Sequence, residues 1–186
     1  MREHIIALLL LATISNEVVI DKAEAQKAFL LINKIRQSPE KYYQELNFDK
    51  SFTVNSTSLK WNDTLARVAE QKAFDMARRD YFSHTDPDGF GINYFIAKSG
   101  YRLAKDWITN KAANFFESIS AEVEDGESAV KNLVIDKGVP SLGHRRHLLG
   151  NGIWESTLTD IGIGFARRDS GSTYQTYVSI IIAKHP

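Results

Sequence analysis

Cysteine is absent from this 186-residue chain, and neither sign of charge prevails in it. Without thiols the chain can form no disulfide framework, has no cysteine nucleophile and lacks the attachment thiol of a lipoprotein. Its 23 lysine and arginine residues balance 23 aspartate and glutamate residues, so there is no general electrostatic attraction to nucleic acid or to an anionic membrane. We therefore expect no nucleic-acid partner.

The enzyme motifs that can be recognised by their spacing are also missing. The sequence contains no HExxH zinc helix, no GxSxG nucleophile elbow and no glycine-rich phosphate loop ending in Lys-Ser or Lys-Thr. For nucleophilic catalysis, Ser83, Ser118 or Ser141 would have to meet a histidine, an orienting acid and an oxyanion hole in space. These observations leave catalysis open.

The composition is that of one globular domain, with 43% hydrophobic and 25% charged residues. The N-terminus resembles a secretory signal peptide, because Arg2 precedes an apolar run over residues 5–14 and Ala23-Glu24-Ala25 offers small residues for cleavage. We predict a signal peptide over residues 1–25, a domain over residues 26–186, and a secreted or periplasmic location. The apolar run is too short to span a bilayer, so no stable membrane insertion is expected. The alternative is an N-terminal helix that packs on the domain.

Hydrophobic spacing predicts helices in most of the chain and strands at its end. Ile161, Ile163 and Phe165 alternate with glycine and alanine, and a turn at residues 169–172 leads into a β-rich segment, which indicates an antiparallel hairpin. The other expected elements are helices over 25–37, 40–46, 93–98 and 126–136, a helix capped by Asn62 or Asp63 that ends before Tyr81, a loop over 47–60 and a strand over 113–119.

Three short phrases contain residues suited to metal or proton chemistry. His84 lies in YFSHTDPDGF, Glu117 in the apolar run FFESIS, and His144 in GHRRHLLG. Neutral imidazole binds metals and titrates near neutral pH, while a carboxylate in an apolar run needs a partner or a cavity. The DPDG segment after His84 is first of all a turn. Taken alone, such a histidine more often has a structural role, for example a hydrogen bond to the backbone at a helix end.

The order of the phrases resembles the CAP superfamily, the SCP-like extracellular domain of cysteine-rich secretory, antigen 5 and pathogenesis-related proteins. The phrases that carry the resemblance are YFSHTDPDG, FESIS, AVKNLVID, LGHRRHLL, DIGIGFA and YVSIIIAK, which extend over roughly residues 29–184. The bacterial branch is the more similar one, because its members share the FSHTxPDG phrase. This resemblance implies an α+β fold, a three-layer α-β-α sandwich with a central, mostly antiparallel sheet.

The resemblance also implies a metal site formed by His84, Glu117 and His144, which would hold Zn²⁺ or another divalent cation. Two weaker candidates are Asp136, which stands where animal members have a second glutamate but is one methylene shorter, and His147, one helical turn after His144. Gly143 is expected to allow a close backbone approach before His144. In FESIS, Phe116 and Ser118 depart from the Gly and Asn that flank the family's glutamate.

Three functions are compatible with these residues. The first is a secreted CAP-domain protein whose His/Glu cleft binds a divalent metal, or a small-molecule, lipid or protein ligand. The second is a metal-assisted hydrolase for peptide or cell-wall material, with Glu117 as general base. The third is a structural or interaction domain without metal, in which the histidines and acids form a hydrogen-bonded network and loops such as 47–60 contact the partner.

Overall fold

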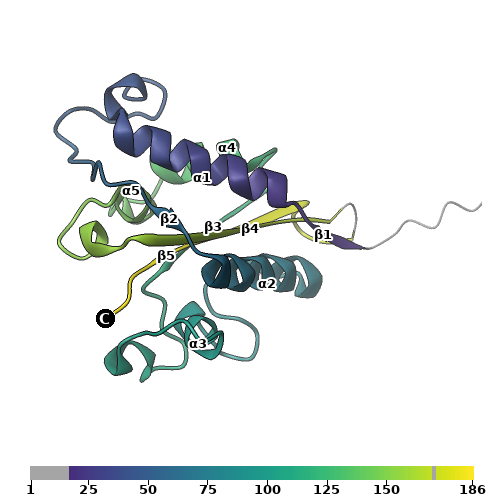
Figure 1. The fold of residues 1–186 in the computed structure, drawn as a ribbon. Coiled ribbons are helices and arrows are strands. Elements are labelled where there is room, and N and C mark those ends of the chain that lie inside the picture. The colour runs from purple at the N-terminus through teal and green to yellow at the C-terminus, as the bar shows by residue number, and fades with distance from the viewer. Residues whose placement is uncertain (1–16, 169–170) are drawn as a thin grey trace, which may run out of the picture.

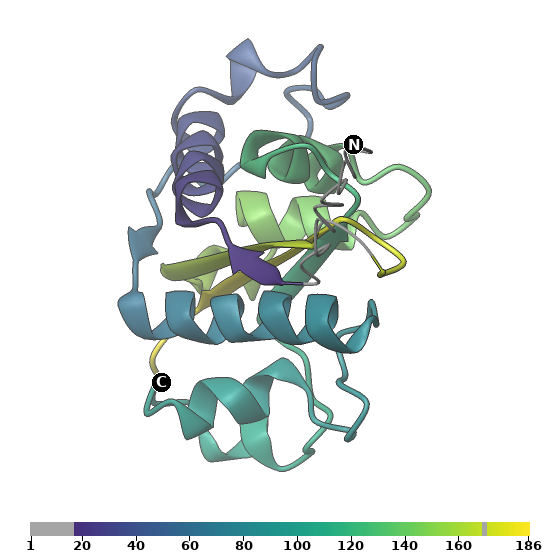
Figure 2. The ribbon, with the colours of Figure 1, turned by 90° about the vertical axis from the view of Figure 1, so that its right-hand side faces the viewer.

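The central sheet of the molecule is covered by helices on both faces (Figures 1 and 2). The computed structural model describes residues 17–168 and 171–186, so most of the predicted signal peptide and part of the predicted turn at 169–172 lie outside the described residues. The elements, in chain order, are β1 (Val18–Ile20), α1 (Lys22–Gln37), η1 (Pro39–Lys41), β2 (Lys60–Trp61), α2 (Asp63–Arg79), α3 (Ile92–Lys98), η2 (Lys105–Ile108), β3 (Glu117–Ala121), α4 (Gly126–Ile135), α5 (Gly143–Leu149), η3 (Glu155–Thr157), β4 (Asp160–Arg168) and β5 (Thr176–Ala183).

The strands follow the order β1-β4-β5-β3, and all of these neighbours are antiparallel. The short β2 pairs with β4 in parallel. Helices α1, α4 and α5 lie on one face of the sheet, and α2 and α3 lie on the other (Figure 1). The structure therefore confirms the predicted three-layer sandwich and places β3, which begins with Glu117, at one edge of the sheet.

Large apolar residues and small residues alternate along β4, so the two faces of the sheet present different surfaces to the helices that cover them. Ile161, Ile163 and Phe165 are fully buried in the main core, as are their predicted counterparts Val178, Ile180 and Ile182 in β5. On the opposite face, a Cβ atom at Gly162 or Gly164 would overlap the backbone of α2. The glycines thus allow α2 to lie directly on the sheet, which large side chains would prevent.

Two predicted elements differ from the structure. Of the segment predicted as a helix over 40–46, only residues 40–41 lie in η1; the following residues form turns, and Asn47 has a φ of +52°. The strand predicted over 113–119 begins only at Glu117, because the preceding residues bind the start of α3 instead. There the backbone N–H of Asn93 donates to Ala113 O at 3.3 Å, and the side-chain oxygen of Asn93 accepts from Phe115 N at 3.0 Å.

Residues 18–25, predicted as the end of the signal peptide, are part of the fold. Val18–Ile20 forms β1 against β4, and the Asp21 carboxylate caps α1 and lies 3.1 Å from Arg167 Nε. The buried Glu24 accepts a hydrogen bond of 3.0 Å from Gly126 N, the first residue of α4. The existence and position of a cleavage site stay predictions, and a cut that preserves these contacts lies before Val18. Within residues 17–168 and 171–186, no helix is long and apolar enough to cross a membrane.

Deletion of residues 1–25 should lower the melting temperature relative to deletion of residues 1–16. The longer deletion removes β1, the Asp21 cap and the Glu24 contact, which together should cost roughly 2 kcal/mol or more. For a domain of this size, that loss corresponds to a decrease of roughly 4–8 °C. Differential scanning calorimetry of the two variants measures it, and equal melting temperatures would mean that residues 18–25 contribute nothing to stability.

Candidate functional site

His84 and Glu117 form the first of two histidine–carboxylate pairs. The Glu117 side chain is fully buried, and its Oε2 lies 3.0 Å from His84 Nδ1. Its other oxygen, Oε1, accepts a hydrogen bond of 2.7 Å from Ser179 Oγ on β5. When Glu117 is ionised it only accepts hydrogen bonds, so His84 Nδ1 then carries the proton and Nε2 is the free nitrogen of a neutral ring. The His84 side chain is 38% exposed, so this free nitrogen belongs to a solvent-accessible ring.

His144 and Asp136 form the second pair. Asp136 Oδ1 lies 2.7 Å from His144 Nδ1, and Oδ2 accepts from the backbone amides of His144 at 2.9 Å and Arg145 at 3.3 Å. The carboxylate therefore caps the first turn of α5 and orients the ring on it. The Asp136 side chain is 2% exposed and that of His144 is 29% exposed. This pair repeats the arrangement of His84 and Glu117.

The backbone between α4 and α5 turns sharply to bring these two residues together. Asp136 ends α4 in the left-handed region, with φ of +52°, and Leu142 precedes α5 with φ of +50°. Aspartate tolerates this region better than most residues, whereas leucine there is strained. The expected role of Gly143 was wrong, because a Cβ atom there would meet only Ser141 Oγ, at an ordinary 3.5 Å. The strain lies at Leu142 instead.

His147, a weaker candidate for the metal site, lies in the core. Its Nδ1 is 2.8 Å from Ser118 Oγ, and its Nε2 faces Ile182 O at a long 3.5 Å. Both nitrogens thus face protein atoms, which leaves neither for sharing a metal with His144. Burial lowers the pKa of His147 to about 4; the hydrogen bond to Ile182 O acts in the opposite direction, and the charge of Arg36 lowers the pKa further. The ring is therefore neutral at pH 7.

The segments that carry the two pairs both contact the beginning of β3. Glu117 binds His84, and the next residue, Ser118, binds His147, which lies one helical turn after His144 on α5. Neighbouring residues of a strand point to opposite faces, so the side chains of Glu117 and Ser118 extend from different faces of this edge strand.

Three buried cations hold the backbone beside the site residues, and each donates to carbonyl oxygens. Lys72 Nζ binds the carbonyls of Ser83 and His84 at 2.8 and 3.3 Å. Arg145 binds the carbonyls of Val134 and Ile135, which end the helix before Asp136. Arg36 Nε binds Leu148 O at 2.8 Å, near the end of α5. The segments that carry His84, Asp136 and His144 are each fixed in this way.

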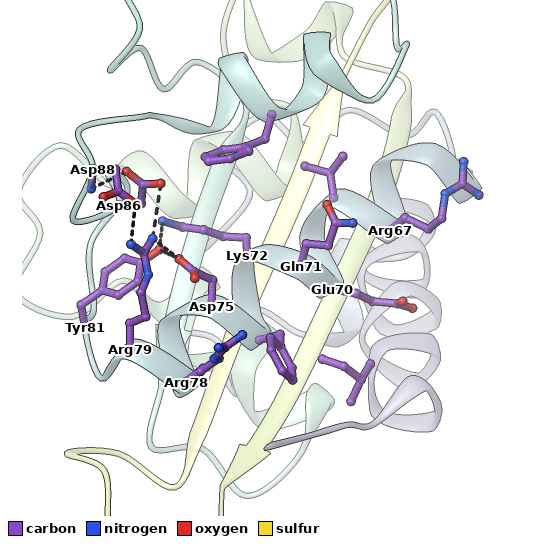
Figure 3. Close-up of a pocket in the computed structure, with 14 residues that line it drawn as sticks. Arg67, Glu70, Gln71, Lys72, Asp75, Arg78, Arg79, Tyr81, Asp86 and Asp88 are labelled. Atoms are coloured by element: carbon purple, nitrogen blue, oxygen red, sulfur yellow. Dashed lines mark hydrogen bonds and ion pairs between the residues drawn. The ribbon is translucent and has the colours of Figure 1, made fainter. Parts of the chain in front are cut away.

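A cavity of about 820 Å³ lies along α2, next to the segment that carries His84 (Figure 3). Its polar end is an ion-pair network in which Arg79 binds Asp75 and Asp88 and lies 3.4 Å from Asp86. Asp86 also accepts from the amides of Asp88 and Phe90, which confirms the predicted turn in DPDG. This cavity is lined by neither of the two histidine pairs.

Comparison with known proteins identifies the family. The model of the Cysteine-rich secretory protein (CAP) family matches residues 30–181, and the chain therefore belongs to this family, although it contains no cysteine. Among curated proteins, none matches the chain significantly.

Two solved bacterial structures share the fold. An extracellular protein containing an SCP domain from Bacillus anthracis str. Ames superposes with a TM-score of 0.53 at 22% identity, over 88% of this chain and 41% of that protein. An outer surface protein from Borrelia burgdorferi superposes with a TM-score of 0.54 at 16% identity, over 91% of this chain and 98% of that one. The chain thus spans about two fifths of the length of the Bacillus protein.

The sequence reasoning missed two residues that contact the histidine pairs. Ser179 is the one serine in the mostly apolar run YVSIIIA, and this isolation was a signal of the same kind as that of Glu117. Lys72 stands four residues from both Val68 and Met76, on the apolar face of α2, and this position was the signal that could have revealed its burial. In the structure it is 5% exposed.

The low pKa of His147 predicts a specific loss of stability in acid. The unfolded chain takes up a proton near pH 6.5, whereas the folded chain takes it up only near pH 4. The stabilisation is therefore complete above about pH 6.5 and is lost as pH falls toward 4. Between pH 7.5 and 5, the parent should lose on the order of 2 kcal/mol more than His147→Asn, which cannot titrate. Urea unfolding at the two pH values measures this, and equal losses would contradict it.

Proposed function

We propose that the chain is a secreted CAP-domain binding protein that holds a divalent cation, most suitably Zn²⁺, between Nε2 of His84 and Nε2 of His144. The observation that carries the proposal is the shared arrangement of the two pairs. In both, a buried carboxylate accepts a hydrogen bond from Nδ1–H, which leaves Nε2 free on a partly exposed ring. Carboxylate–histidine pairs of this type orient imidazole ligands in metal sites.

The proposed metal site would be an open one. Within residues 17–168 and 171–186, no three His, Cys, Asp or Glu side chains are placed to hold a metal together. The protein would thus supply two nitrogens, and Glu117 and Asp136 would act through hydrogen bonds to the ligating rings. Zinc usually has four ligands, so water or a donor atom of a small-molecule, lipid or protein ligand would complete the coordination. A bound Zn²⁺ would supply a Lewis acid with open positions.

The hydrogen bonds of Glu117 favour binding over hydrolysis. A general base needs a free carboxylate oxygen within reach of a water molecule. Both oxygens of Glu117 are engaged, one by Ser179 and one by His84. Secretion is supported by the extracellular and outer surface descriptions of the Bacillus and Borrelia neighbours.

Zinc should raise the melting temperature of the parent, prepared without a polyhistidine tag, but not that of His84→Ala or His144→Ala. At a hundredfold excess over Kd, a ligand specific for the folded state stabilises by about 2.7 kcal/mol, which corresponds to roughly 5–10 °C here. Affinity should fall as pH decreases, because protons compete for the imidazole nitrogens. Thermal shift and isothermal titration calorimetry at pH 7.5 and 5.5 check both statements.

The matched control is His185→Ala, because His185 is an exposed histidine near Asp160 that belongs to neither pair. It should respond to zinc like the parent. Equal stabilisation of the parent and the His84→Ala/His144→Ala double variant would reject metal binding here and favour a hydrogen-bonded structural network.

Glu117→Gln separates binding from catalysis. The amide keeps the shape of the side chain but removes its charge. A hydrolase that used Glu117 as its base would lose turnover by roughly 10²–10⁴-fold while retaining the metal. We expect instead no peptide or cell-wall hydrolysis in the parent, and a 10–100-fold weaker zinc affinity in the variant, as is usual when the hydrogen-bond partner of a ligand is lost. Turnover that disappears in Glu117→Gln would establish the hydrolase.

A further inference from the structure

We propose that Lys72 is the positioning residue of His84: its ammonium group fixes the backbone at Ser83 and His84 so that the His84 ring meets Glu117. The predicted effect of Lys72 on metal affinity rests on the proposed function above. Its predicted effect on the position of the His84 ring does not require a metal.

Lys72 lies on the side of α2 that faces the segment after the helix, and all three of its ammonium protons have acceptors. Nζ is 2.8 Å from Ser83 O, 3.3 Å from His84 O and 3.2 Å from Tyr81 Oη. It also lies 4.8 Å from the centre of the Tyr81 ring, within the range of a cation–π interaction. Within the described residues, no carboxylate lies within ion-pair distance of it. Lys72 thus acts as a hydrogen-bond donor to a bend in the chain.

The segment that Lys72 binds has few other attachments. Tyr81 N still donates to Met76 O at the end of α2, and Asp86 begins the following turn. Between them, residues 82–84 belong to no helix or strand, and within the described part of the chain they make no backbone–backbone hydrogen bond outside regular elements. His84 is therefore held from two directions, by Lys72 at its carbonyl and by Glu117 at its ring.

The neighbouring cation cannot take over this role. Arg79 is directed into the carboxylates of Asp75 and Asp88 (Figure 3), whereas the Lys72 side chain extends toward Tyr81 from one side of the network. A buried ammonium group loses its favourable hydration, and here hydrogen bonds to carbonyl and hydroxyl oxygens offset this loss. Removal of the ammonium leaves the carbonyls of Ser83 and His84 without this donor, and the bend is then free to shift away from Glu117.

Lys72→Met tests the proposal, because methionine keeps an unbranched apolar stem and removes the donors. The matched control is Arg168→Met. Arg168 donates to Ala77 O, also on α2, at 2.7 Å, but it lies on β4 and contacts neither histidine pair. Both variants should melt at lower temperature than the parent. Only Lys72→Met should change the His84 ring.

The decisive readout is long-range ¹H–¹⁵N NMR of the histidine rings in metal-free protein. The parent should show His84 as the single Nδ1-protonated tautomer, and Lys72→Met should show a mixture of tautomers. The signals of His144 should be unchanged. In the control, both rings should match the parent. A His84 signature that is unaltered in folded Lys72→Met would overturn the proposal.

If Lys72→Met does not fold, Lys72→Arg takes its place. The planar guanidinium keeps the charge but cannot direct three donors to the same point, so the His84 tautomer should again be mixed. Isothermal titration calorimetry then measures zinc binding. The zinc affinity should fall at least tenfold in the Lys72 variant and not in Arg168→Met. A parent that binds no zinc would reject the proposed function, while the NMR comparison would still decide the role of Lys72.

Discussion

The buried carboxylate of Glu117 is the group on which the site and the sheet edge both depend. A carboxylate without solvent is costly unless donors surround it, and breaking such an arrangement by removing one partner costs several kcal/mol. Glu117 receives one donor from β5, through Ser179, and one from the segment after α2, through His84. The same contacts therefore attach the edge strand to its neighbour, hold a loop on the sheet and set the tautomer of a histidine.

Cations bound to carbonyl oxygens are the second recurring feature. Lys72, Arg145 and Arg36 are all buried, and each binds backbone next to a site segment. Because the acceptors are backbone carbonyl oxygens, each of these cations orients a backbone segment without forming an ion pair with a carboxylate of the described residues. Burial lowers the pKa of Arg36 to about 10, well above neutral pH, and the guanidinium stays charged. The buried cations thereby fix loops that have few hydrogen bonds of their own.

The sequence predicted the layers of this fold well because their signals are local. The Asn62 cap of α2 and the alternation at Ile161, Ile163 and Phe165 follow from neighbouring residues alone, and the structure contains both. The strand expected at 113–119 was four residues too early, since Asn93 of α3 captures the chain before it. His147 shows the same limit, because its placement depends on Ser118 and Ile182, which are distant in sequence.

From the sequence, Asp136 was expected to be only a weaker candidate, and the reason why it nevertheless contacts His144 is geometric. The shorter side chain of aspartate suggested insufficient reach, but the left-handed turn at Asp136 moves the backbone itself toward α5. Side-chain length alone does not determine such a contact, because a change of one φ angle displaces the carboxylate by more than one methylene.

The register of β4 also determines how the molecule would respond to pulling. β1 pairs with residues 166–168 of β4, whereas β5 ends at Ala183, opposite Asp160. The first and last strands therefore leave the sheet at opposite ends of β4, roughly 25 Å apart. A force applied between them is parallel to the strands and perpendicular to the ladder hydrogen bonds, which must break together rather than one after another. Glu117 lies opposite Ile181, toward the end of the sheet away from β1, so an attachment through Val18 would direct the two histidine pairs away from the point of attachment.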